Sequence, residues 1–183
     1  MLLPPPEKGK VSIMIKYVTG NILDSEADAI LHQVNCQGAM GAGLAKQIKD
    51  RYPHVYEKYR TACTKDKFEC RALGLDKSRL LGKIQIIPKQ HHSENESNIA
   101  SQVIVNLFAQ EFFGRDRRYT DYDALRSCLR KVNERFAGQT VAIPYFMGCG
   151  LAGGSWDIVL EIIVREFQDC NVLIYKYFQK QND

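Results

Sequence analysis

Residues 140–156 read TVAIPYFMGCGLAGGSW, and their pattern is the clearest indication of the fold class. The apolar run over 140–146 predicts a buried strand, because it is short and bounded by polar and glycine residues. A glycine-rich loop follows over 147–154. Apolar residues at helical spacing then predict a helix over 156–168, with Ser155 as its N-cap. A strand that passes through a loop into a helix is typical of α/β proteins.

A second unit of the same kind lies earlier in the chain, at residues 29–44, which read AILHQVNCQGAMGAGL. Its first seven residues predict a strand, and residues 35–43 predict a second glycine-rich loop, which opens a helix at Leu44. Leu44 and Ile48 share one face of this helix. Pro53 is expected to end or kink it, because proline lacks the N–H of the helical hydrogen bond.

The remaining segments alternate in the same way between strand-like and helical patterns. The clearest helix is predicted over 121–137, with an apolar stripe from Leu125 to Phe136 and a capping box formed by Thr120 and Asp123. This alternation predicts an α/β domain with a mixed, largely parallel sheet covered by helices on both faces. Further strands are predicted at 13–18, 83–88, 102–109 and 171–175, and a solvated loop at 91–98.

Length and composition fit a single globular domain. The chain has 183 residues, of which 45% are apolar and 25% charged. Its net charge of +4 permits an anionic ligand. The charge is too small for a dedicated nucleic-acid binder, so nucleic acid is not expected as a partner. No apolar run approaches the length of a membrane span, so no membrane partner is expected either.

The N-terminus and the cysteines bear on where the protein works. Residues 1–12 lack the basic and apolar regions of a secretory signal and are expected to form a flexible extension. The cysteines have no metal-finger spacing, so they are expected to be reduced thiols in the cytoplasm. Neither a metal nor another cofactor is expected. The six cysteines are Cys36, Cys63, Cys70, Cys128, Cys149 and Cys170.

The two glycine loops favour the binding of phosphate groups. Glycine lets the backbone approach an anion closely, and the helix that follows adds unpaired N–H groups and the positive end of its dipole. Gly148, Gly150 and Gly153 match the spacing of a dinucleotide-binding fingerprint, but that fingerprint belongs at the first strand of its fold. A P-loop is excluded, because neither loop ends in Gly-Lys-Ser/Thr.

Several stretches together resemble the macro domain family. They are YVTGNIL (17–23), ILHQVNC (30–36), GAGLA (41–45), IPYFMGCGL (143–151) and VLIY (172–175). The resemblance covers about 13–177, and the macro domain is expected to span 13–178. It implies a three-layer α/β/α sandwich that binds ADP-ribose in a surface cleft. The single-domain branch with ADP-ribose 1''-phosphate phosphatases and terminal ADP-ribose protein hydrolases is the most similar.

The resemblance also implies which residues hold the ligand. Asn21 stands where the family usually has Asp, so its contact with adenine would lack charge assistance. Ala152 stands where the hydrolases of glutamate-linked ADP-ribose have Asp, and no Lys matches theirs. By position, Asn21, Ile22 and Tyr175 would hold adenine, Asn35 the distal ribose, Gly41, Ala42 and Gly43 the ribose and one phosphate, and Gly148, Cys149, Gly150 and Leu151 the diphosphate. Gly20, beside Asn21, would also contact the ligand.

His32 and Asn35 are the candidates for catalysis. A histidine can donate a proton to a leaving group or accept one from water near neutral pH. Residues an odd number apart on a strand point to opposite faces, so a joint role requires the chain to leave strand geometry around Val34. The alternative is that His32 is a satisfied residue of the core. Cys149 could be a nucleophile, but a plain loop residue is the simpler interpretation.

Three functions follow from these expectations. The first is an enzyme that acts on the distal end of ADP-ribose derivatives, as an ADP-ribose 1''-phosphate phosphatase or as a hydrolase that removes ADP-ribose from modified protein or nucleic acid. The second is a reader that binds ADP-ribose without catalysis. The third is a protein that binds RNA or poly(ADP-ribose), which steep loss of affinity with salt would indicate. The expected partners are ADP-ribose or its derivatives, including ADP-ribosylated protein.

Overall fold

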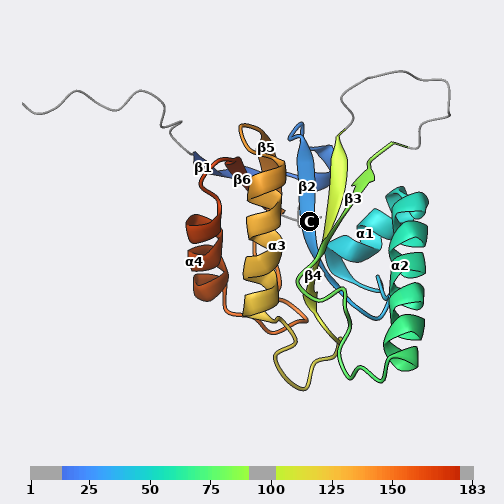
Figure 1. Cartoon of the computed structure of the whole chain (residues 1–183). Coiled ribbons are helices and arrows are strands. Elements are labelled where there is room, and N and C mark those ends of the chain that lie inside the picture. The colour runs from blue at the N-terminus through green and yellow to red at the C-terminus, as the bar shows by residue number, and fades with distance from the viewer. Residues whose placement is uncertain (1–13, 91–101, 178–183) are drawn as a thin grey trace, which may run out of the picture.

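The computed structural model describes residues 14–90 and 102–177, which form one six-stranded sheet (Figure 1). The strand order is β1-β6-β5-β2-β4-β3. All neighbours are parallel except β3, which pairs antiparallel with β4 at one edge. The prediction of a mixed, largely parallel sheet is therefore confirmed. The strands are β1 (Ile15–Thr19), β2 (Ala29–Asn35), β3 (Ile84–Pro88), β4 (Val103–Gln110), β5 (Thr140–Pro144) and β6 (Asn171–Lys176).

Helices cover both faces of the sheet. Figure 1 shows α1 and α2 on one face and α3 and α4 on the other, which confirms the three-layer arrangement. On the second face Leu31 and Val105 pack with Leu129, and no side chain of the three is exposed. The helices are α1 (Gly43–Arg51), α2 (Pro53–Ala72), α3 (Tyr122–Arg135) and α4 (Trp156–Glu166), and a short 3-10 helix, η1, spans Ile22–Asp24.

The ends of the helices test the sequence predictions in detail. Pro53 separates α1 from α2 and takes the first position of the longer helix, as its missing N–H allows. The prediction of a capping box formed by Thr120 and Asp123 is wrong. The N-cap of α3 is Asp121, whose carboxylate accepts from the N–H groups of Asp123 and Ala124. Ser155 is at the N-cap of α4, but its side chain makes no capping hydrogen bond.

Strands β2 and β5 diverge at the centre of the sheet. They share only two residue pairs, Ala29 with Val141 and Ile30 with Ala142, whereas β2 pairs with β4 along its whole length. After β2 the chain continues to α1 on one face, and after β5 it continues to α4 on the other (Figure 1). Such a switch point at the carboxyl ends of parallel strands is where open α/β sheets bind their ligands.

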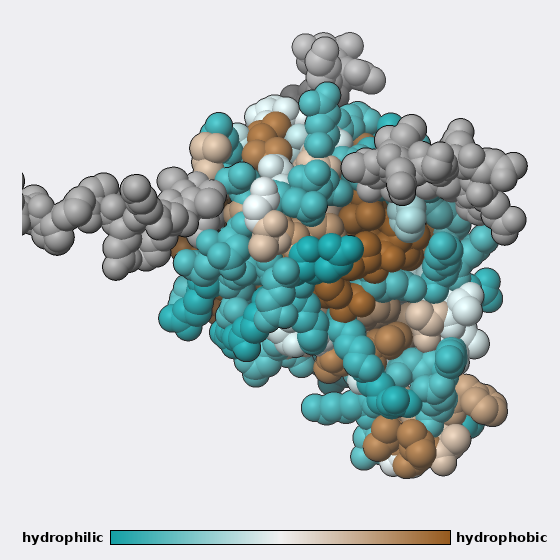
Figure 2. Space-filling view, turned by 45° about the horizontal axis from the view of Figure 1, so that its top comes forward, coloured by the Kyte–Doolittle hydropathy of each residue, from teal (hydrophilic) through white to brown (hydrophobic). Residues whose placement is uncertain are grey.

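Hydrophilic residues predominate on the face of the domain that Figure 2 shows. Apolar side chains gather near the centre of this face, and polar ones surround them. Among the described residues, no helix is long and apolar enough to cross a membrane. The six cysteines are all free thiols. The cytoplasmic location and the domain limits 13–178 stay predictions. The expected extension over 1–12 and the loop over 91–98 lie outside the described residues.

Candidate functional site

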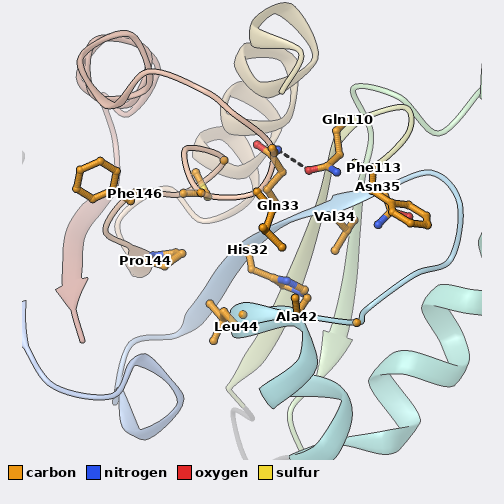
Figure 3. Close-up of a pocket in the computed structure, with 18 of the residues that line it drawn as sticks. His32, Gln33, Val34, Asn35, Ala42, Leu44, Gln110, Phe113, Pro144 and Phe146 are labelled. Carbon is orange, nitrogen blue, oxygen red and sulfur yellow. Dashed lines mark hydrogen bonds between the residues drawn. The ribbon is translucent and has the colours of Figure 1, made fainter. Parts of the chain in front are cut away.

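A cavity of about 460 Å³ opens at the carboxyl edge of the sheet, where β2 and β5 have separated. Figure 3 shows Pro144 and Phe146 on one side of it and Asn35, Gln110 and Phe113 on the other. Both glycine loops and the start of α1 contribute to its lining. The predicted site residues that line it are His32, Asn35, Gly41, Ala42, Gly43, Gly148, Gly150 and Leu151.

Asn35 shapes the first glycine loop (35–43). The β2–β4 register shifts between Val34 and Asn35, so the departure from strand geometry that a role for His32 requires is present. The Asn35 carboxamide oxygen accepts from the N–H groups of Gln37 at 2.9 Å and Ala39 at 3.2 Å, and from the Tyr59 hydroxyl at 2.9 Å. Its NH₂ donates to the Ala39 carbonyl at 2.7 Å. One N–H of Asn35 is therefore left for a ligand.

The first glycine loop leads into a helix start that no side chain caps. Ala42 is the N-cap of α1 and offers no side-chain acceptor, so the N–H groups of the first turn remain available. A Cβ atom added at Gly41 or Gly43 would meet nothing within 4 Å. Gly43 has a φ of +56°, which glycine adopts without strain. The loop thus presents bare backbone to the cavity, as an anion site requires.

The second glycine loop (147–154) is held by polar side chains that the sequence analysis missed. The Thr120 hydroxyl donates to the Gly148 carbonyl at 2.6 Å and accepts from the Gln33 amide at 2.9 Å. The same Gln33 NH₂ donates to Gln110 at 2.8 Å, as Figure 3 shows. Gly154 N–H also donates to the Gly148 carbonyl, at 2.9 Å. These bonds tie the loop to β2 and β4.

This network leaves no room for a side chain at Gly148. A Cβ atom there would lie 2.5 Å from the Gln33 carboxamide oxygen and 2.9 Å from the Thr120 hydroxyl, and the φ of Gly148 is +72°. Gly150 differs, since a Cβ atom there would meet nothing within 4 Å. The N–H groups of Gly148, Gly150 and Leu151 make no hydrogen bond to another described residue. The loop can therefore donate several N–H groups to one anion.

The residues predicted to hold adenine lie together but outside this cavity. Gly20 follows β1, and a Cβ atom there would approach the Tyr175 ring at 4.0 Å. Ile22 and Tyr175 pack in the same apolar cluster as Leu44, which lines the cavity. The Asn21 carboxamide oxygen accepts from Leu23 N–H at 3.0 Å and so caps η1. These residues lie at the same carboxyl edge of the sheet as the cavity.

His32 lies on the floor of the cavity, with its ring beside Ala42 and Leu44 (Figure 3). Its side chain is buried, and Nε2 lies 2.5 Å from Asn106 Oδ1. Nδ1 has no hydrogen-bond partner among the described residues. Burial lowers the pKa of His32 to about 4, so the ring is neutral near pH 7. His32 is therefore buried, as expected of a core residue, and it also lines the cavity, as a catalytic role would require.

Cys149 is a poor candidate for a nucleophile. It is half-buried, its Sγ lies 3.3 Å from the Met147 carbonyl, and it is not among the residues that line the cavity. Burial raises the pKa of its thiol to about 11. The reactive thiolate is therefore scarce near pH 7.

The loop after β4, residues 111–121, adds a cation to the cavity that was not predicted from the sequence. Arg115 is the one cavity-lining residue, among those described, that carries a full charge near pH 7. Arg117 and Arg118 lie over the rings of Tyr119 and Tyr122, at 5.2 and 4.5 Å. The three arginines in the sequence GRDRRY were the available signal.

Aromatic rings form one wall of the cavity. Phe146 has a φ of +61°, a conformation that non-glycine residues rarely adopt, and its ring centre lies 4.3 Å from that of Tyr145. Trp156 packs on Tyr145 at 4.9 Å, so it is a packing residue. In the described parts of the chain, no group of three or more His, Cys, Asp or Glu side chains could hold a metal ion.

The fold and the cavity define a class of protein: an α/β/α sandwich whose two backbone loops can receive an anionic ligand between diverging strands. No family model matches the chain. An ADP-ribose 1''-phosphate phosphatase of Neosartorya fischeri is 31% identical over 176 residues, which cover 80% of this chain and 87% of the relative. The macrodomain of Mycobacterium tuberculosis DarG superposes with a TM-score of 0.68 at 25% identity, over 89% of this chain and 97% of that one. The chain belongs to the macro domain family.

A longer bacterial relative is similar over much of this chain. The DNA ADP-ribosyl glycohydrolase of Mycobacterium bovis is 30% identical over 168 residues, or 88% of this chain. The match covers 42% of that relative, so this chain spans less than half of its length.

Substitution of the two glycines of the second loop by alanine should have opposite outcomes. Gly148→Ala forces a side chain onto Gln33 and Thr120 at a positive φ, so we expect it to lower the free energy of unfolding by about 2 kcal/mol or more. Gly150→Ala enters open space and should stay within about 0.5 kcal/mol of wild type. Urea unfolding of both variants measures the difference. Equal stability of the two would contradict the network around Gly148.

The low pKa of His32 predicts a loss of stability in acid. Between pH 6.5 and about 4 the unfolded chain binds a proton at this ring more readily than the folded one, so stability falls as the pH drops through this window. From pH 7 to pH 5 we expect wild type to lose about 2 kcal/mol more than His32→Gln. Urea unfolding at both pH values gives the comparison, with His54→Gln as control. Parallel losses in wild type and His32→Gln would show that His32 is not held neutral.

Proposed function

We propose that the chain binds ADP-ribose in the cleft along the carboxyl edge of the sheet. The observation that carries the proposal is the pair of bare backbone loops, which can donate N–H groups to a diphosphate from both sides. Membership of the macro domain family and the names of the relatives support this ligand. Adenine would then lie near Tyr175, the diphosphate between the glycine loops, and the distal ribose near Asn35.

We further propose that the protein is an enzyme that removes the terminal phosphate of ADP-ribose 1''-phosphate. The N. fischeri relative is named for this activity. In Figure 3 Phe113 lies with Asn35 on the side of the cavity where the distal ribose would lie, and Arg115 belongs to the same loop. A guanidinium there would neutralise a phosphate monoester by charge-assisted hydrogen bonds. Plain ADP-ribose has no group at that place that needs a cation.

A second candidate is hydrolysis of an ADP-ribosyl linkage to nucleic acid. The name of the M. bovis relative and the position of Arg117 and Arg118 beside the second glycine loop favour it. The carbonyl of Arg117 and the Cα of Arg118 lie 3.4 and 3.3 Å from the position of a Cβ at Gly153. Against it stand the modest net charge and the partners of these arginines, whose guanidinium groups lie over tyrosine rings.

Free ADP-ribose should stabilise the folded protein. At about 100 times its Kd a ligand contributes about 2.7 kcal/mol, which for a chain of this length raises Tm by about 5–10 °C. Gly150→Glu should abolish the shift, because its carboxylate fills the space of the phosphates. Gly150→Ala should keep most of it. Thermal unfolding with and without ligand measures each case. A wild-type protein that shows neither a shift nor heat of binding at millimolar ADP-ribose would refute the proposed ligand.

Product analysis separates the two reactions. We expect wild type to release inorganic phosphate from ADP-ribose 1''-phosphate, and Arg115→Gln to lower kcat/KM about 10–100-fold while its affinity for ADP-ribose changes less than threefold. Arg117→Gln is the matched control, because the Arg117 guanidinium lies over the Tyr119 ring in the wild type. Its kcat/KM should resemble that of the wild type. Release of ADP-ribose from modified DNA instead would favour the second candidate. Binding without any turnover would make the protein a reader.

A further inference from the structure

A row of three polar side chains crosses strands β2, β4 and β3. His32 lies opposite Asn106, and Asn106 lies opposite Gln85, in the register of the sheet. His32 Nε2 contacts Asn106 Oδ1 at 2.5 Å, and Asn106 Nδ2 donates to Gln85 Oε1 at 2.9 Å. Gln85 Nε2 donates to the backbone carbonyl of Lys58 in α2 at 3.1 Å. The row connects the floor of the cavity with the far end of the sheet.

The carbonyl of Lys58 sets the direction of every bond in the row. A carbonyl oxygen only accepts, so Gln85 must point its NH₂ at Lys58 and its oxygen at Asn106. Asn106 must then point its NH₂ at Gln85 and its oxygen at His32. Because that oxygen also only accepts, the proton of the neutral imidazole must lie on Nε2. Nδ1 is left with a lone pair.

This lone pair has no donor in the described structure. Nδ1 is buried without a hydrogen-bond partner, and His32 lines the cavity. Figure 3 shows Ala42 of the first glycine loop and Leu44 of α1 beside the ring. A buried acceptor without a donor is costly, and a ligand that supplies the donor recovers that cost.

We propose that His32 Nδ1 accepts a hydrogen bond from an O–H group in the cavity, and that Asn106 and Gln85 are positioning residues that keep it an acceptor. The O–H belongs to a hydroxyl of the distal ribose or to a water molecule beside it. The identity of the ligand rests on the proposed function, whereas the protonation of the ring does not. Of the two roles that the sequence left to His32, the row selects the acceptor and excludes a proton donor at Nδ1.

Two substitutions of Gln85 with opposite hydrogen-bonding character test the row. Gln85 is half-buried on the edge strand, so it can accept a charge. Gln85→Glu still offers Asn106 an acceptor, and the proton should stay on Nε2. Gln85→Lys offers only donors, so Asn106 must turn its amide round and donate to Nε2, which moves the proton to Nδ1.

The tautomer of the free protein is read by ¹⁵N NMR of the imidazole nitrogens at pH 7, with His32→Gln to assign the signals. We expect Nε2–H in wild type and in Gln85→Glu, and Nδ1–H in Gln85→Lys. A merely structural role of Gln85 would not move the proton between two folded variants. A wild-type ring protonated on Nδ1, or a folded Gln85→Lys protein that keeps Nε2–H, would overturn the proposal.

Titration with ADP-ribose and with ADP distinguishes the source of the O–H. If the ribose supplies it, the Nδ1 signal shifts toward that of a hydrogen-bonded acceptor with ADP-ribose but not with ADP. If water supplies it, both ligands or the free protein give the bonded signal.

Affinity for ADP-ribose should be about three- to tenfold lower in Gln85→Lys than in Gln85→Glu. An Nδ1 signal of a bare lone pair in every state would overturn the acceptor role. Failure of wild type to bind ADP-ribose would instead refute the proposed function, with the tautomer result intact.

Discussion

The early separation of β2 from β5 is the constraint on which the site depends. The two strands share only the pairs that end at Ile30 and Ala142, and beyond them the chain continues to opposite faces of the sheet. Backbone groups of β2 that face β5 after this point lack a strand partner, and such groups are not left buried and unpaired in stable proteins. An opening at this place is therefore built into the topology, and both glycine loops border it.

The same separation explains why a central strand carries polar residues. Neighbouring residues of a strand point to opposite faces, so His32 and Gln33 turn to opposite layers of the sandwich. His32 joins Asn106 on the side of α1 and α2, and Gln33 joins Thr120 and Gln110 on the other side. Each group fixes one element of the site, the imidazole proton in the first case and the second glycine loop in the second. Buried polar groups specify a single arrangement most strongly when every atom has a partner, and His32 Nδ1 and Gln33 Oε1 have none among the described residues.

Most of the fold could be predicted from local patterns in the sequence. The strand at 29–35 and the break at Pro53 follow from an apolar run and from the missing N–H of proline, and the strand predicted over 140–146 is present but ends at Pro144. The capping error at Thr120 has a tertiary cause. Thr120 looked like a cap, but its hydroxyl is engaged by Gly148 and Gln33, which lie far away in the sequence. Asp121 takes the cap instead.

The site could be predicted only in part, because local sequence patterns show some of its residues and tertiary contacts determine the others. Glycine-rich loops can be recognised from consecutive residues of the sequence, so residues such as Gly43 and Gly150 were predicted as site residues. Gln33, Gln110 and Asn106 were not predicted. Their roles depend on hydrogen bonds between neighbouring strands, which form only in the register of the folded sheet. Arg115 was missed because a charged residue in a loop is usually only solvated, and its place beside the cavity depends on how residues 111–121 fold back.

The distribution of charge in the cleft indicates which groups would bind the ligand's phosphates and which would distinguish one ligand from another. Backbone N–H groups hold a diphosphate whatever is attached to its ends, because they contact only phosphate oxygens. Discrimination must then come from the ends of the cleft. The cavity is lined by one cation, Arg115, by Asn35, which keeps one amide N–H without a protein partner in the described structure, and by the neutral His32. In the binding mode that we propose, a cation and an acceptor in the same cavity suit a group that carries negative charge together with an O–H beside it. A phosphorylated ribose combines these two features, and so does the phosphate monoester with its attacking water.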